Sequence, residues 1–162
     1  MALDPENTLV MELKSGPVVI RLRPDLAPKH IERIKKLTRE GFYDGVVFHR
    51  VIPDFMAQTG DPTGTGTGGS RYDDLRAEFS DASHNRGTVA MARKGHPNSA
   101  NSQFFICFAE APWLDGQYTV WGEVVEGMDH VDAIKQGGDH NNGAISGIPD
   151  KVVKMRIAAD KG

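Results

Sequence analysis

The 162-residue chain has a single cysteine, no long apolar run and no excess of basic residues. Cys107 cannot form an internal disulfide, and its place in the apolar run FFICF predicts a buried thiol and not a nucleophile. No stretch approaches the ~20 apolar residues of a membrane span, and MALDPENT does not resemble a leader. The net charge of -3 argues against a nucleic-acid partner. We therefore expect a cytoplasmic protein with neither membrane nor nucleic acid as a partner.

Signals for metal, phosphate and hydrolytic sites are also scarce. The six histidines show no H-x-H or H-x-x-x-H spacing, which argues against a metal site. The segment GDPTGTGTGGS is rich in glycine but lacks the lysine and the following helix of a P-loop, so it is interpreted as a structural turn. Asp61, Glu78 and Asp115 are separated by turns and do not form a carboxylate pair. We expect no cofactor and no metal.

The length and the residue pattern predict one mainly β domain over residues 1–162. Eighteen glycines and nine prolines indicate tight turns between short strands. Alternating apolar residues predict a hairpin over 9–22, and a helical repeat predicts about three helical turns from Pro28 to Gly41. Further strands are expected in VVFHRVI, DFMAQTG, GTVAMA, QFFICF and YTVWGEVV, a second helix over Met128–Gln136 and a closing strand over Val153–Ile157. Together, about eight strands and two helices favour a closed or nearly closed antiparallel barrel.

Two predicted strands place an amide and an apolar side chain on the same face. Met56 and Gln58 are two residues apart, as are Gln103 and Phe105, and a strand has a side-chain period of two. Amides can bond the backbone of an extended peptide while the apolar groups receive its side chains. The sequence therefore predicts a peptide-binding surface.

Arg50 lies in the strand that precedes this surface, and neither neighbour, His49 or Val51, is acidic. A strand arginine is commonly a solvated or ion-paired surface residue, but an apolar pocket beside it suits another role. Rotation about an X-Pro amide crosses a barrier of ~18–20 kcal/mol, and the proline nitrogen regains its lone pair as the amide twists. A donor aimed at that nitrogen stabilises the transition state without any proton transfer. His49 is accordingly expected to be a packed strand residue and not an acid or base.

Three segments resemble the signature blocks of the cyclophilins, and bacterial cytoplasmic members in particular: FHRVIPDFMAQTGDPTGTGTGG, MARKGHPNSANSQFFICF and WLDGQYTVWGEVVEGMDHVDAI. Their order and spacing agree along nearly the whole chain. The resemblance implies a peptidyl-prolyl cis/trans isomerase that assists protein folding, built as a closed eight-stranded antiparallel barrel capped by two helices. Proline-containing peptides and unfolded chains are its implied partners, and a monomer is expected.

The resemblance also assigns site residues. It makes Arg50 catalytic and places substrate-binding residues at Phe55, Met56, Gln58, Ala92, Arg93, Gln103, Phe105, Trp113, Leu114 and Tyr118. Three positions depart from the best-known animal members. Arg93 replaces an asparagine, His96 resembles a one-residue insertion, and Tyr118 replaces a histidine at the pocket edge. Trp113 resembles the tryptophan that contacts cyclosporin in the family, so cyclosporin is a further candidate ligand.

Two other functions remain open from the sequence. A peptide-binding or chaperone-like module would use the same surface without turnover, although binding alone needs no donor over the proline nitrogen. A lipid-carrier barrel would be hollow, whereas the many large apolar residues predict a filled interior. Trp113 follows a proline and precedes a turn and is expected to be exposed, whereas Trp121 is expected in the core.

Overall fold

The computed structural model describes residues 4–137, 143–145 and 147–160. Its elements follow in chain order as η1 (Pro5–Asn7), β1 (Thr8–Leu13), β2 (Gly16–Leu22), α1 (Pro28–Arg39), β3 (Arg50–Ile52), β4 (Met56–Thr59), β5 (Thr88–Met91), β6 (Phe104–Cys107), η2 (Pro112–Leu114), β7 (Val120–Glu126), α2 (Met128–Asp132) and β8 (Lys154–Ile157). None of the helices in this part of the chain is both long enough and apolar enough to cross a membrane.

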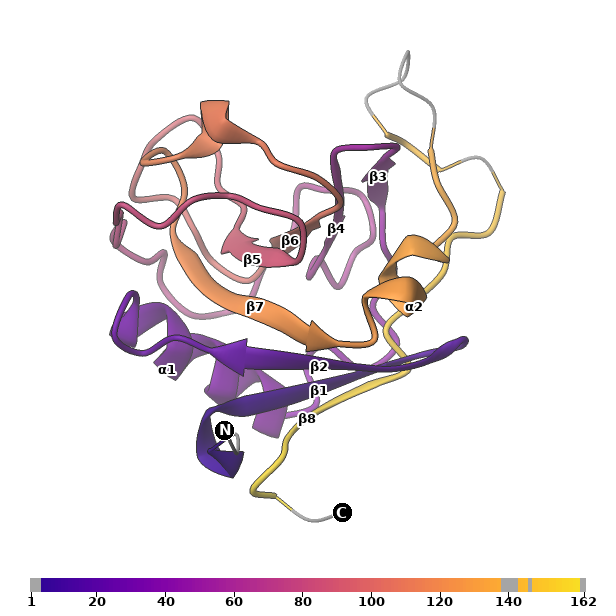
Figure 1. Cartoon of the computed structure of the whole chain (residues 1–162), viewed down its shortest axis with the longest axis horizontal. Coiled ribbons are helices and arrows are strands. Elements are labelled where there is room, and N and C mark those ends of the chain that lie inside the picture. The colour runs from indigo at the N-terminus through magenta and orange to yellow at the C-terminus, as the bar shows by residue number, and fades with distance from the viewer. Residues whose placement is uncertain (1–3, 138–142, 146, 161–162) are drawn as a thin grey trace.

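Eight antiparallel strands form one curled sheet in the order β3-β4-β6-β5-β7-β2-β1-β8 (Figure 1). The mainly β class is confirmed, but the predicted closed barrel is wrong, because no ladder joins the outer strands β3 and β8 in the described residues. β3 has only three residues, and Pro53 and the left-handed Asp54 (φ 63°) end it in a turn. The outer edge of β3 instead meets residues 143–144: Arg50 bridges Ala144, and the Val51 N–H donates to the Gly143 carbonyl at 2.8 Å. A further isolated bridge joins Val47 to Lys151.

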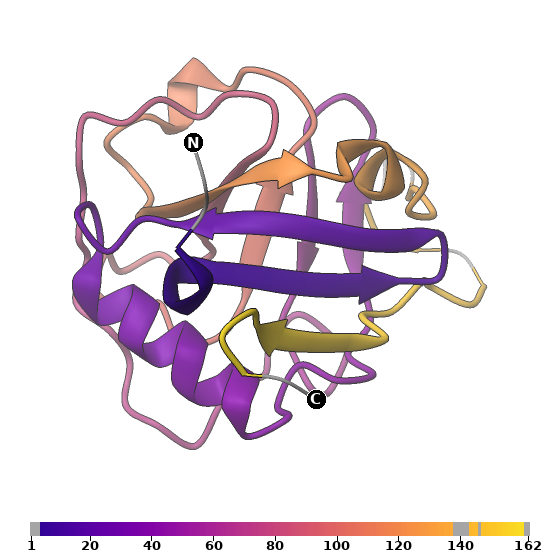
Figure 2. The same cartoon turned by 60° about the horizontal axis from the view of Figure 1, so that its bottom comes forward.

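The hairpin and the long helix are confirmed. β1 and β2 pair from Thr8 with Arg21 to Leu13 with Gly16, which leaves a two-residue turn. As the alternation predicts, Leu9 and Met11 face the core. α1 begins at Pro28 and lies beside β8 (Figure 2).

α2 is shorter than predicted and ends at Asp132 instead of Gln136. The helix ends early because the backbone N–H groups of the following residues donate to acceptors outside the helix. The Lys135 N–H donates to the Asp150 carboxylate at 2.8 Å, and the Gly137 N–H donates to the carbonyl of Val51 at 2.8 Å. A bond to a charged acceptor outweighs one more helical turn at a frayed end.

The closing strand also starts later than predicted. Val153 precedes β8 and is 48% exposed, while Val152 is buried in its place. The Val153 N–H still donates to the Glu12 carbonyl at 2.8 Å, so Val153 is bonded to β1 although it lies outside β8.

The interior is filled by large side chains, as the sequence predicts. Phe104 lies at its centre, edge-on to Tyr43 at 5.4 Å and to Trp121 at 5.4 Å between ring centroids. All three are 0% exposed, and the Tyr43 hydroxyl donates to the Ser102 carbonyl at 2.8 Å. A packed core of this kind leaves no room for a carried lipid.

His30 near the start of α1 predicts a pH-dependent stability. Its Nδ1 lies 2.7 Å from Glu78 and its side chain is 0% exposed; burial lowers the pKa of His30 and outweighs the opposing effect of Glu78. The unfolded chain therefore binds more protons below pH ~6.5, so the free energy of unfolding falls on acidification, by at most about 1.4 kcal/mol per pH unit for one histidine. In urea titrations from pH 7 to pH 5, His30→Gln should flatten this slope. The exposed His96, replaced in the same way, is the control, and an unchanged slope in His30→Gln would contradict the assignment.

Candidate functional site

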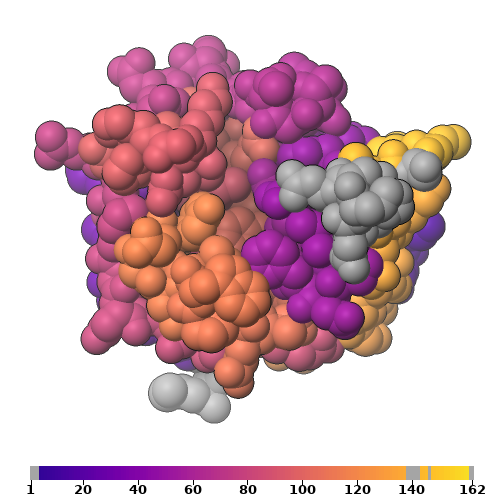
Figure 3. Space-filling view, turned by 90° about the horizontal axis from the view of Figure 1, so that it is seen from above, coloured from indigo at the N-terminus to yellow at the C-terminus, as the bar shows by residue number. Residues whose placement is uncertain are grey.

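The candidate site is a groove on the outer face of the sheet, above β3, β4 and β6. From above, a hollow lies between the purple segment that carries β3 and β4 and the orange segment around residues 110–120 (Figure 3). Two adjoining pockets occupy it, one of about 90 Å³ and one of about 250 Å³. They share Gln58, Ala92 and Arg93, so the groove is continuous.

The smaller pocket brings together residues that the sequence predicted. Its lining consists of Arg50, Phe55, Met56, Gln58, Ala92, Arg93, Phe105, Leu114 and Tyr118, all of them predicted site residues. The strand register explains the arrangement: Arg50 pairs with Gln58 and Gln58 with Phe105, so these three side chains form one row across β3, β4 and β6.

Apolar groups make the base of this pocket. Met56 is 1% exposed, Phe105 4% and Leu114 8%. Tyr118 stands edge-on to Phe105, with ring centroids 5.6 Å apart at 89°. The pocket is of a size that suits a small apolar ring such as that of proline.

Sequence reasoning missed two residues that support the base. The buried His84 ring stacks on Phe105 with centroids 6.1 Å apart. Its Nδ1 lies 3.0 Å from Asp115, which also accepts the His84 N–H at 2.7 Å. The two residues are 31 positions apart in separate loops, so no local pattern could pair them.

A chain of hydrogen bonds connects the polar residues. Arg50 Nη1 donates to Gln58 Oε1 at 3.2 Å, and Gln58 Nε2 donates to Gln103 Oε1 at 2.9 Å. Gln103 Nε2 donates in turn to the carbonyls of Gly66 at 3.1 Å and Gly68 at 2.9 Å. Burial lowers the pKa of Arg50 below its ordinary value, yet a guanidinium remains protonated at neutral pH. The groove therefore holds a half-buried cation beside an apolar pocket.

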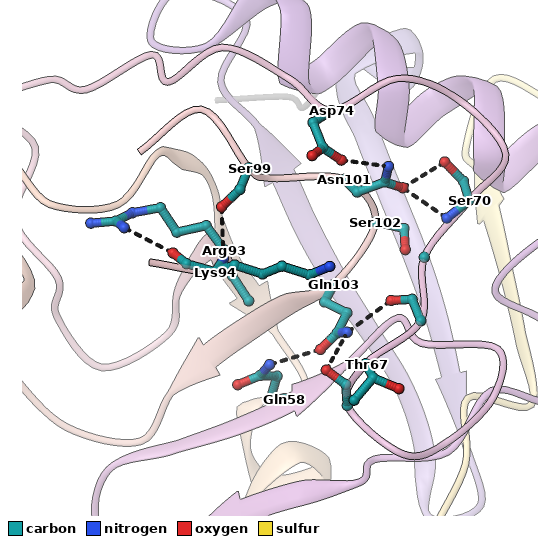
Figure 4. Close-up of a pocket in the computed structure, with 14 residues that line it drawn as sticks. Gln58, Thr67, Ser70, Asp74, Arg93, Lys94, Ser99, Asn101, Ser102 and Gln103 are labelled. Carbon is teal, nitrogen blue, oxygen red and sulfur yellow. Dashed lines mark hydrogen bonds between the residues drawn. The ribbon is translucent and has the colours of Figure 1, made fainter. Parts of the chain in front are cut away.

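The larger pocket is mostly polar (Figure 4). Gln103 lines this pocket next to the smaller one, and Lys94, Asp74 and Asn101 are also part of its lining. Asn101 donates to Asp74 at 3.1 Å and accepts from the Ser70 N–H at 2.7 Å, which fixes this wall.

A sequence model of the family described as cyclophilin-type peptidyl-prolyl cis-trans isomerase/CLD matches residues 8–157. The chain belongs to this family. The cyclophilin is 59% identical to a probable peptidyl-prolyl cis-trans isomerase of Brucella suis, over 98% of this chain and 86% of the relative. It is 47% identical to a Schizosaccharomyces pombe peptidyl-prolyl cis-trans isomerase, over 73% of this chain and 78% of that one.

Solved structures agree with the fold. A cyclophilin from Hirschia baltica superposes with a TM-score of 0.88 at 28% identity, covering 100% of this chain and 77% of its own. A Cryptosporidium parvum cyclophilin-type isomerase, crystallised in the presence of the dipeptide Ala-Pro, gives 0.84 at 27% identity, covering 93% of this chain and 98% of its own. This chain is thus a peptidyl-prolyl cis-trans isomerase.

Arg93 and Tyr118, both predicted site residues, interact with each other. The Arg93 guanidinium lies 4.9 Å from the Tyr118 ring centroid. It also donates to the carbonyls of Gln117, Lys94 and Gly95 at 3.0–3.1 Å. His96 is exposed, and its Nδ1 accepts the Asn98 N–H at 3.0 Å. The contacts of Arg93 with Tyr118 and with these carbonyls stabilise the rim of the cyclophilin groove on this side.

One predicted site residue, Trp113, lies at the margin of the groove. Trp113 is 65% exposed, as expected, and its ring lies 5.7 Å from Phe55, outside both pockets. His49 is half-buried beside Gly66, and burial lowers its pKa. A neutral, packed His49 agrees with the sequence interpretation.

Cys107 is buried in β6, and burial raises the pKa of its thiol to about 12. Since the thiolate is the reactive form, we expect iodoacetamide at pH 8 to leave the folded protein unmodified and to alkylate Cys107 once urea unfolds it. Mass spectrometry measures both reactions. Equal rates in the folded and unfolded protein would show that the thiol is accessible.

Proposed function

We propose that Arg50 performs the isomerisation by donating a hydrogen bond to the proline nitrogen of a twisted X-Pro amide. The observation that carries this proposal is the guanidinium at the edge of the apolar pocket formed by Met56, Phe105 and Leu114. In the planar amide the nitrogen lone pair is delocalised and accepts poorly. Donation therefore strengthens as the bond twists, which stabilises the transition state more than the ground state.

The energies are sufficient without bond breaking. Lowering the barrier from ~19 to ~15 kcal/mol brings turnover to tens per second. A charge-assisted hydrogen bond contributes about 1.5–3 kcal/mol, and exchanging water for the apolar pocket adds to it. No proton changes place, so no acid or base is needed beside Arg50.

The substrate we propose is an extended proline-containing segment, as in peptides and unfolded chains. The proline ring enters the smaller pocket, while the amides of Gln58 and Gln103 and the backbone near Ala92 and Arg93 face the rest of the segment. The Ala-Pro dipeptide present with the Cryptosporidium relative supports a ligand of this kind. Acceleration of slow, proline-limited folding steps would follow from this activity. The single domain over 1–162, the monomeric state and the cytoplasmic location stay predictions of the sequence.

The test is exchange between cis and trans isomers of an Ala-Pro peptide, followed by NMR with and without the protein. We expect exchange to be accelerated at catalytic concentrations, and a proline-limited refolding phase to be shortened. Binding without faster exchange would instead favour the peptide-binding module. The same assay with added cyclosporin measures whether the surface of Phe55 and Trp113 binds that peptide.

A further inference from the structure

The glycine-rich loop 61–68 is organised around one buried carboxylate. Asp61 is 0% exposed. It accepts the backbone N–H groups of Thr63, Thr65, Gly66 and Gly68 at 2.8, 3.1, 2.6 and 3.1 Å, and the Thr63 hydroxyl at 2.7 Å. The loop is thus a structural turn, as predicted: its donors are directed at the protein's own anion.

These partners are neutral, so oriented dipoles hold the charge of Asp61 in place. Burial by itself raises the pKa of Asp61, but the hydrogen bonds from Thr63, Gly68 and Gly66 outweigh it and keep the pKa well below its ordinary 3.8. The carboxylate is therefore ionised throughout the neutral pH range.

The two glycines at the end of this loop connect Asp61 to the groove. Gly66 and Gly68 each donate their N–H to Asp61 and offer their carbonyl to Gln103 Nε2. With its NH2 group on the loop, Gln103 must turn its oxygen toward Gln58. Gln58 then has its NH2 group occupied and presents its oxygen to Arg50, as the observed bonds show.

We propose that Asp61 is a positioning residue for the isomerisation, and that its carboxylate orients Arg50 through the loop carbonyls, Gln103 and Gln58. This inference rests on the role proposed for Arg50. The loop has little freedom to compensate. A Cβ at Gly68 would collide with the Asp61 carboxylate, and Gly66 adopts a left-handed φ of +91° that other residues rarely adopt.

The first experiment replaces the carboxylate by its amide in Asp61→Asn. The amide NH2 would face backbone donors, so the loop carbonyls should move away from Gln103. We expect kcat/KM for an Ala-Pro peptide to fall about ten- to a hundred-fold, with kcat falling more than peptide affinity, because Arg50 acts in the transition state. The ¹⁵N side-chain amide signals of Gln58 and Gln103 should shift as well.

The matched control is Asp44→Asn. Asp44 also accepts a backbone N–H, from Met155 at 2.9 Å, but lies outside the groove. The Asp44→Asn variant should lose stability alone. It should leave kcat/KM and the side-chain amide signals of Gln58 and Gln103 unchanged. An equal loss of kcat/KM in Asp44→Asn would overturn the positioning role, because losing any carboxylate that accepts a backbone N–H would then lower the activity.

A double-mutant cycle tests the path. In a Gln103→Ala background the connection is already cut, so adding Asp61→Asn should cause no further loss of kcat/KM. Additive losses would overturn the inference, as would a folded Asp61→Asn protein with unchanged kinetics and amide signals. If Asp61→Asn does not fold, Gly68→Ala replaces it in the cycle, because this substitution also displaces the Gly68 carbonyl that accepts from Gln103. An inactive wild-type protein would instead refute the proposed function itself.

Discussion

Arg50→Ala is expected to abolish most of the isomerase activity, lowering kcat/KM by about 100- to 1,000-fold, the loss seen when a transition-state donor is removed. The apolar pocket of Met56, Phe105 and Leu114 remains in the variant, so peptide binding should weaken far less than turnover. NMR exchange spectroscopy on an Ala-Pro peptide measures both quantities in one experiment.

The fold should survive this change because Arg50 is half-buried in the groove and belongs to no core cluster. Arg21→Ala is the matched control, since it removes a strand arginine that pairs with Glu123 at 3.1 Å away from the groove. A folded Arg50→Ala protein with wild-type turnover would remove Arg50 from the mechanism.

Phe104→Ala is expected to have the largest effect on stability. The ring is 0% exposed and contacts Tyr43 and Trp121 edge-on, so truncation loses both apolar burial and aromatic contacts and leaves a cavity. Loss of a buried phenylalanine costs about 3–5 kcal/mol, which corresponds to a drop in Tm of about 10 °C. Urea unfolding and calorimetry measure it.

The next residue provides the comparison. Phe105 lies on the opposite face of β6 and lines the groove. Phe105→Ala should therefore lose activity out of proportion to stability, whereas Phe104→Ala should keep its turnover at temperatures where it is folded. If the two substitutions gave the same ratio of lost activity to lost stability, the two faces of β6 would not have the separate roles assigned here.

Local patterns were sufficient for most elements. Alternation in β1 and β2 located the hairpin, because one face of each strand is buried and the side-chain period of a strand is two. Pro28 and the apolar repeat located α1, because proline favours the first helical position and one face of the helix is buried. Where a distant group competes, local patterns failed. Asp150 takes the N–H of Lys135 and shortens α2, and residues 143–144 bond the outer edge of β3 at Arg50 and Val51 in place of β8.

The sequence by itself indicated the family through its signature segments, and that resemblance implied the composition of the pocket. A side-chain period of two placed Met56 with Gln58, and Gln103 with Phe105, on one face of their strands. Only the tertiary structure decided which groups meet. It opened the sheet, placed His84 behind Phe105 and joined Gln58 to Gln103 across 45 positions. It also turned the amides of a glycine loop onto Asp61. Such contacts depend on strand register and loop closure, which no short segment encodes.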